Sequence, residues 1–122
     1  MIIKGVVIYG EGDGTKLGFP TANLKLTTDS ERALTGIYAV WVSIKNQPAR
    51  AGILVSGVYQ EDTDLPRQEV YVLNFDGDLY GKELVVEVVQ KIRDVVRTAD
   101  TKQLKKMIAN DINKTREILK II

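Results

Sequence analysis

Hydrophobic and polar positions alternate in short runs over the first three-quarters of the chain, which is the period of β-strands. These runs are rich in β-branched and aromatic residues and are separated by turn-forming residues. The predicted strands are Ile2–Tyr9, Gly36–Lys45, Ala49–Gly57, Glu69–Phe75 and Glu83–Ile92. Because Gly36–Lys45 is apolar on both faces, we expect it to be a central strand or to be covered on its outer side. The dipeptide Asp76-Gly77 predicts a hairpin between the last two strands.

The period changes after Arg97 to that of a helix. Apolar residues at 104, 107, 108, 112, 118 and 119 fit one helical face. Asp100 followed by Gln103 resembles a capping box and predicts where the helix begins. Several short antiparallel strands followed by one helix indicate a small closed barrel, because closure removes exposed strand edges. The helix is expected to cover one side or one mouth of that barrel.

Composition narrows the function classes. The chain has 122 residues, 44% of them hydrophobic and 27% charged, so residues 1–122 are interpreted as one globular domain. A formal net charge of +1 argues against a dedicated nucleic-acid binder. No apolar run is long enough to span a membrane, and the N-terminus lacks signal-peptide features. The chain has no cysteine and no histidine, which together exclude thiol chemistry, zinc sites built from these residues and catalysis by a histidine base. With no cysteine, we also expect a cytoplasmic protein.

Residues 10–24, GEGDGTKLGFPTANL, are the segment that suggests chemistry. Gly10, Gly12, Gly14 and Lys16 favour a loop whose backbone amides cradle phosphates, although a flexible β-turn is the alternative. The order Gly14-Thr15-Lys16 is not a Walker A sequence, which requires Lys followed by Ser or Thr.

Three residues at the end of this segment suggest a metal site. Pro20 stiffens the chain, and in an extended segment Thr21 and Asn23 project to the same side. A hydroxyl and a carboxamide oxygen are suitable neutral ligands for Mg²⁺ that phosphates also hold. The alternative is an ordinary turn or β-edge.

The segment resembles the signature of the ATP-dependent riboflavin kinase (flavokinase) family, and LGFPTANL is its most specific part. The similarity continues through Thr35–Val40, Glu69–Phe75, Asp78–Gly81, Ile92-Arg93 and Met107–Ile112. It implies a six-stranded antiparallel Greek-key barrel with a C-terminal helix. It also implies transfer of the ATP γ-phosphate, with a divalent cation such as Mg²⁺, to the ribityl 5′-hydroxyl of riboflavin, giving FMN.

The resemblance also implies roles for individual residues. Glu69 would be the catalytic carboxylate, Thr21 and Asn23 would hold Mg²⁺ and phosphate, and Arg93 would lie in the loop that closes on the flavin side. The implied cofactor-binding residues are Gly10, Gly12, Gly14, Lys16, Pro20, Thr21, Asn23 and Arg93.

Glu69 also stands out from the residues alone. Without histidine, the base must be a carboxylate, and Glu69 is the best-placed candidate. It shares a strand face with the large apolar residues Tyr71, Leu73 and Phe75, where a carboxylate is costly to bury without a partner. The alternative is a strand-end glutamate in water, paired with Arg67.

Two loops, 58–68 and 94–98, depart from the family pattern. They keep open a catalytically weak flavin- or nucleotide-binding module of the same fold. A third hypothesis, an oligonucleotide-binding barrel, lacks a basic excess and a run of aromatic residues. We expect a monomer with riboflavin/FMN and ATP/ADP as partners, without nucleic acid, membrane or an adenylyltransferase domain.

Overall fold

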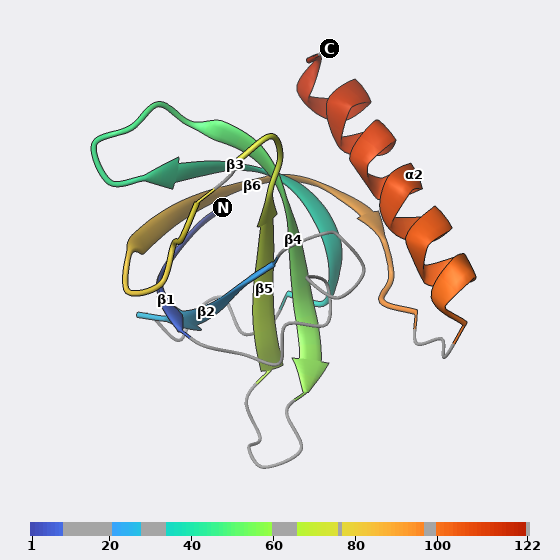
Figure 1. Ribbon diagram of the computed structural model, residues 1–122, viewed down its shortest axis with the longest axis horizontal. Coiled ribbons are helices and arrows are strands. Elements are labelled where there is room, and N and C mark those ends of the chain that lie inside the picture. The colour runs from blue at the N-terminus through green and yellow to red at the C-terminus, as the bar shows by residue number, and fades with distance from the viewer. Residues whose placement is uncertain (9–20, 28–33, 60–65, 76, 97–99, 122) are drawn as a thin grey trace.

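The computed structural model describes residues 1–8, 21–27, 34–59, 66–75, 77–96 and 100–121. These residues form strands followed by one long helix (Figure 1). The elements are β1 (Ile2–Ile8), β2 (Ala22–Leu26), β3 (Gly36–Ile44), β4 (Arg50–Tyr59), β5 (Pro66–Val72), β6 (Glu83–Arg93) and α2 (Thr101–Leu119). The pattern predicted every one of these strands except β2, which sequence reasoning treated only as an extended segment.

The strands close into an antiparallel barrel in the order β1-β2-β5-β4-β3-β6. Neighbours in the barrel are therefore often distant in the chain, as in a Greek key. The predicted six-stranded antiparallel barrel with a C-terminal helix is confirmed.

The predicted hairpin at Asp76-Gly77 is wrong. Both edges of β5 are already occupied, by β2 and β4, while β6 pairs with β1 and β3. The chain after β5 instead crosses one end of the barrel, where Leu79 is buried at 9% exposure. It then joins β1 through hydrogen bonds from Gly81 N to Val7 O and from Val7 N to Lys82 O. Asp76 itself lies outside the described residues.

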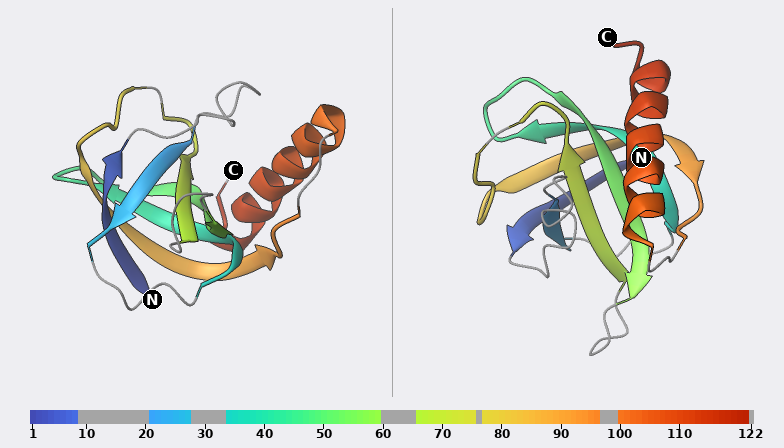
Figure 2. Two further views of the ribbon diagram at one scale, coloured as in Figure 1. Left: turned by 90° about the horizontal axis from the view of Figure 1, so that it is seen from below. Right: turned by 45° about the vertical axis from the view of Figure 1, so that its right-hand side comes forward.

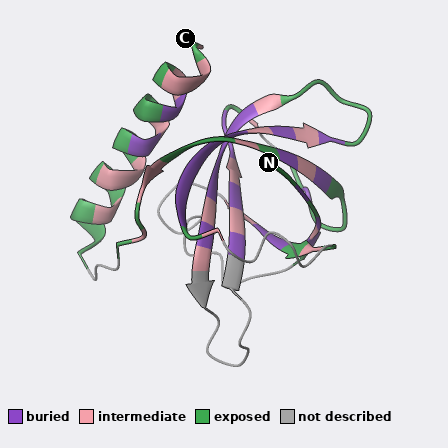
Figure 3. Ribbon diagram, turned by 180° about the vertical axis from the view of Figure 1, so that it is seen from behind, coloured by how far each residue is buried: buried purple, intermediate pink, exposed green. Residues whose placement is uncertain are grey.

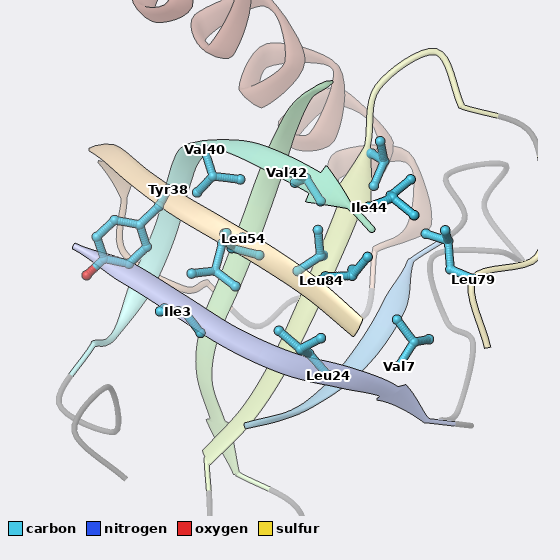
Figure 4. Close-up of a cluster of buried hydrophobic side chains, with 13 residues drawn as sticks. Ile3, Val7, Leu24, Tyr38, Val40, Val42, Ile44, Leu54, Leu79 and Leu84 are labelled. Atoms are coloured by element: carbon cyan, nitrogen blue, oxygen red, sulfur yellow. The ribbon is translucent and has the colours of Figure 1, made fainter. Parts of the chain in front are cut away.

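The barrel interior is filled by side chains from every strand (Figure 4). Alternate residues of β3 point inward, so Tyr38, Val40, Val42 and Ile44 all belong to this core. The residues between them face outward, yet Ile37 and Ala39 are also buried. Since α2 packs against β3, β4 and β6, the helix covers this outer face (Figure 2). The expectation that this strand is covered on its outer side is confirmed.

Helix α2 begins where its cap was predicted. Asp100 has extended backbone angles, and its carboxylate accepts hydrogen bonds from Lys102 N at 3.0 Å and Gln103 N at 3.3 Å. The helix ends at Lys120, whose left-handed φ of 57° forms a C-cap. Its only fully buried residues in the described part are Asp111 and Thr115, while the predicted apolar positions flank them half-buried (Figure 3). No helix in the described part of the chain combines the length and apolarity needed to cross a membrane.

Candidate active site

A line of directly paired residues runs around the outer face of the barrel. Each member is the register partner of the next, so the line passes through all the strands. We call it the transverse row; in order it contains Ile8, Asn23, Glu69, Val55, Ile37 and Arg93. Because directly opposed residues of antiparallel strands share a face, the predicted site residues Asn23, Glu69 and Arg93 all lie on the outer face of the barrel, with Asn23 and Glu69 on neighbouring strands.

Asn23 and Glu69 are adjacent members of this row, on β2 and β5. Both face outward, because their chain neighbours Leu24 and Val70 belong to the barrel core. Directly paired residues have Cβ atoms roughly 4.5–5.5 Å apart. The structure therefore brings together the predicted metal ligand and the predicted catalytic carboxylate, which are far apart in the sequence.

The burial of the two side chains differs. Asn23 is only 5% exposed, and its Oδ1 atom is buried without a hydrogen-bond partner. Glu69 is half-buried on the same face as half-buried Tyr71. A buried carbonyl oxygen without a donor is costly unless a cation or another donor occupies its lone pairs. This orphaned oxygen beside a carboxylate fits an oxygen-preferring divalent cation.

The other predicted residues of the loop can be placed only in part. Thr21 directly precedes β2 and is half-buried, two positions from Asn23. Gly10, Gly12, Gly14, Lys16 and Pro20 lie outside the described residues, so their roles stay predictions. Within the described residues, no group of three or more acidic, histidine or cysteine side chains could hold a metal by itself.

Arg93 lies at the far end of the transverse row and is joined to helix α2. Its Nε donates to Asp111 Oδ1 at 2.9 Å, and its Nη2 donates to Asp111 Oδ2 at 2.7 Å. The third nitrogen, Nη1, donates to the backbone oxygen of Asp94 at 3.0 Å. The predicted role of Arg93 on the flavin side is untested, but its guanidinium is held by the helix. Sequence reasoning missed Asp111, although a carboxylate among the apolar positions of a helix was a visible signal.

The strand end next to Arg93 carries a second, exposed ion pair between Lys91 and Asp94 at 2.7 Å. The hydrogen bond from Lys91 lowers the pKa of Asp94, and the same bond raises the pKa of Lys91. Close by, Gly36 has a φ of +132°, and a Cβ there would lie 2.6 Å from Lys91 Cε. Glycine is thus required where β3 starts beside the end of β6.

The chain is similar to known proteins over most of its length. The sequence profile of the family described as "Flavokinase: Riboflavin kinase" matches residues 1–119. A bifunctional riboflavin kinase/FMN adenylyltransferase from Pseudomonas fluorescens is 37% identical over 118 residues, covering 95% of this chain and 37% of the relative. The chain spans about a third of the length of such curated relatives.

Two solved structures have a similar fold. A riboflavin kinase from Trypanosoma brucei superposes with a TM-score of 0.72 at 22% identity, covering 98% of this chain and 76% of that one. At this identity the similarity concerns the fold alone. A protein from Streptococcus pneumoniae described as a macrolide-efflux protein gives a TM-score of 0.87 at 30% identity, covering 94% of this chain and 38% of that one.

Proposed function

Because the chain belongs to the riboflavin kinase family, we propose that it transfers the γ-phosphate of ATP to the ribityl 5′-hydroxyl of riboflavin and forms FMN. The observation that carries the proposal is the direct pairing of Asn23 with Glu69 on the outer face of the barrel. Phosphoryl transfer needs positioning and charge neutralisation more than covalent chemistry, and this pair can contribute to both.

In the proposed reaction Glu69 orients the acceptor hydroxyl and takes its proton. The hydroxyl oxygen forms a bond to the γ-phosphorus, the bond from that phosphorus to the β,γ-bridging oxygen breaks, and ADP leaves. With no histidine in the chain, a carboxylate is the natural group for this task. The half-buried position of Glu69 keeps it accessible to a substrate while limiting its contact with bulk water.

Thr21 and Asn23 are the residues that would hold Mg²⁺, which supplies positive charge to offset the phosphates. The unpartnered Oδ1 of Asn23 supports this assignment. The predicted phosphate loop, with Gly10, Gly12, Gly14, Lys16 and Pro20, precedes β2, so we place ATP on the Asn23 side of Glu69.

The other side of Glu69 is left for the acceptor. Its next neighbour in the transverse row is Val55, followed by Ile37 and then Arg93. Val55 is half-buried and open to a ligand, whereas Ile37 is only 4% exposed and is not. An apolar side chain such as Val55 suits a flat aromatic ring system, whereas triphosphate requires charge and backbone donors. We therefore place riboflavin along the part of the row that leads toward helix α2.

The sharpest test is the variant Glu69→Gln, which keeps the shape and removes the base. We expect the rate at which riboflavin and ATP are converted to FMN and ADP, with Mg²⁺ present, to fall by about 10²- to 10⁴-fold, the usual contribution of a general base. Riboflavin binding, followed by its own fluorescence, is expected to persist.

Glu87→Gln is the matched control, because Glu87 is an exposed strand glutamate on β6. Its turnover should equal that of the wild type. A loss of less than tenfold in Glu69→Gln would remove Glu69 from the role of base. Riboflavin binding without turnover in the wild-type chain would indicate a flavin-binding module instead of a kinase.

The proposal includes a cytoplasmic monomer that does not bind nucleic acid. Size-exclusion chromatography tests the monomeric state, and titration with single-stranded oligonucleotides at low and high salt tests the absence of nucleic-acid binding. Salt-sensitive oligonucleotide affinity would contradict that absence.

A further inference from the structure

The ion pair between Arg93 and Asp111 occupies an unusual position. It joins the last residue of β6 to the middle of α2, and the Asp111 side chain is only 6% exposed, against 25% for Arg93. Both carboxylate oxygens receive a guanidinium nitrogen, so the pair is bidentate. Thr115, the other buried residue of the helix, donates its hydroxyl to Asp111 O at 2.8 Å.

A contribution to the free energy of folding does not by itself explain why the chain has this buried ion pair. Taking two charges out of water has a large desolvation cost, and well-packed apolar residues in their place are often as stable or more stable. A bidentate arginine–carboxylate contact instead provides a fixed direction, because the planar fork accepts one orientation of its partner. The pair therefore sets the rotation and the lengthwise position of α2 against the barrel, which apolar packing alone specifies less strictly.

The location of the pair connects this restraint to the proposed reaction. Arg93 is the member of the transverse row three strands from Glu69, about 14 Å along the surface at the usual strand spacing of about 4.8 Å. Between them lie half-buried Val55, on which the acceptor was placed, and Ile37, which is buried. Helix α2 packs on β3, β4 and β6, the strands that carry Ile37, Val55 and Arg93 (Figure 2).

We propose that Arg93 and Asp111 are positioning residues for the acceptor: their ion pair holds α2 in the place that shapes the riboflavin side of the site. Three of the five guanidinium N–H groups of Arg93 are already engaged, by Asp111 and by the backbone of Asp94. In this proposal Arg93 acts through the helix, and the single variants below separate this role from direct contact with the flavin. This inference rests on the proposed riboflavin kinase function.

The test replaces both partners together, as Arg93→Met with Asp111→Leu. This variant is expected to fold with a melting temperature equal to or above that of the wild type, because no buried charge is left unpaired. Its KM for riboflavin should nevertheless rise about tenfold or more, while its KM for ATP stays within about twofold. Hydrogen exchange of the α2 amides should become faster.

Two single variants separate positioning from direct contact. Asp111→Asn keeps Arg93 and frees it from its charged partner. If Arg93 bound flavin directly, riboflavin affinity would be kept or improved, whereas the positioning role predicts weaker binding. Asp111→Glu retains the charge and should recover part of the lost affinity. Lys91→Gln is the control, because it removes an exposed ion pair on the same strand and should leave both KM values unchanged.

The outcomes distinguish this inference from the proposed function. If the wild type makes no FMN but binds riboflavin, the kinase proposal fails and the positioning role is judged by the riboflavin dissociation constants of the same variants. If the wild type does neither, both proposals are overturned. A folded double variant with unchanged riboflavin affinity and unchanged exchange in α2 would overturn the positioning role alone.

Discussion

At the residue scale, the informative side chains are polar ones in buried positions, where an apolar side chain would have a lower free-energy cost of burial. Asn23 lies on the outer face of the barrel and Asp111 at the contact between the barrel and the helix, and we propose a role in the reaction for each. Gln68 is different, because it points into the barrel at 2% exposure, opposite Leu24 and Ser56. Both its Nε2 and Oε1 atoms are buried without a partner.

The amide of Gln68 is therefore expected to destabilise the fold. Gln68→Met keeps the length of the side chain and removes both polar atoms. We expect the free energy of unfolding to increase by about 1–3 kcal/mol, the usual cost of leaving a buried polar group unsatisfied. Chemical denaturation measures this, with Gln90→Met on the exposed part of β6 as the control. A decrease would show that the amide has a partner, such as a buried water.

At the element scale, α2 depends on its ends as much as on its apolar face. The helix has no acidic residue in its first turn, and Asp100 caps it by accepting two backbone hydrogen bonds. Its described contact with the barrel is centred on Asp111 and Thr115, two polar residues, while its apolar side chains are only half-buried. The start of the helix is therefore secured mainly by the cap.

Removing the cap should loosen the first turn. Asp100→Ala is expected to lower the free energy of unfolding by about 1 kcal/mol, a typical value for losing an N-cap. Asp100→Ser retains an oxygen acceptor and should lose much less. Thermal unfolding followed by circular dichroism measures both. Equal losses in the two variants would show that the side-chain acceptor does not stabilise the helix.

At the scale of the whole molecule, the barrel is closed by a segment that the local pattern misassigned. After β5 the chain passes over the end of the barrel, inserts Leu79 among core residues, and bonds to β1 before β6 begins. Asp78 supports this path by accepting a hydrogen bond from Tyr80 N at 2.9 Å. The segment that resembles the family at Asp78–Gly81 thus has a structural role as the cover of one barrel end.

Leu79 should then contribute to the free energy of unfolding as much as a core residue, although it lies in the segment between β5 and β6. Leu79→Ala is expected to reduce the free energy of unfolding by about 2–4 kcal/mol, through lost burial and the cavity that remains. Val89→Ala, at an exposed strand position, should change it by less than about 0.5 kcal/mol. Urea denaturation compares the two. A similar small effect in both would mean that the barrel end is open to solvent.

The sequence by itself determined the features that depend on near neighbours along the chain. Alternation located most of the strands, the change of period located the helix, and Asp100 marked its start. The run from Gly10 to Asn23 pointed to the family because it is a contiguous signature. Local residues control these features through side-chain direction and capping, so they can be read without knowing the fold.

Only the tertiary structure decided which strands are neighbours. It placed Glu69 beside Asn23, sent the chain after β5 to β6 without a hairpin, and paired Arg93 with Asp111. These contacts join residues distant in the chain, and their stability depends on how all the strands and the helix bury their apolar faces together. Periodicity states which face of a strand is apolar, but it does not say which partner will cover it.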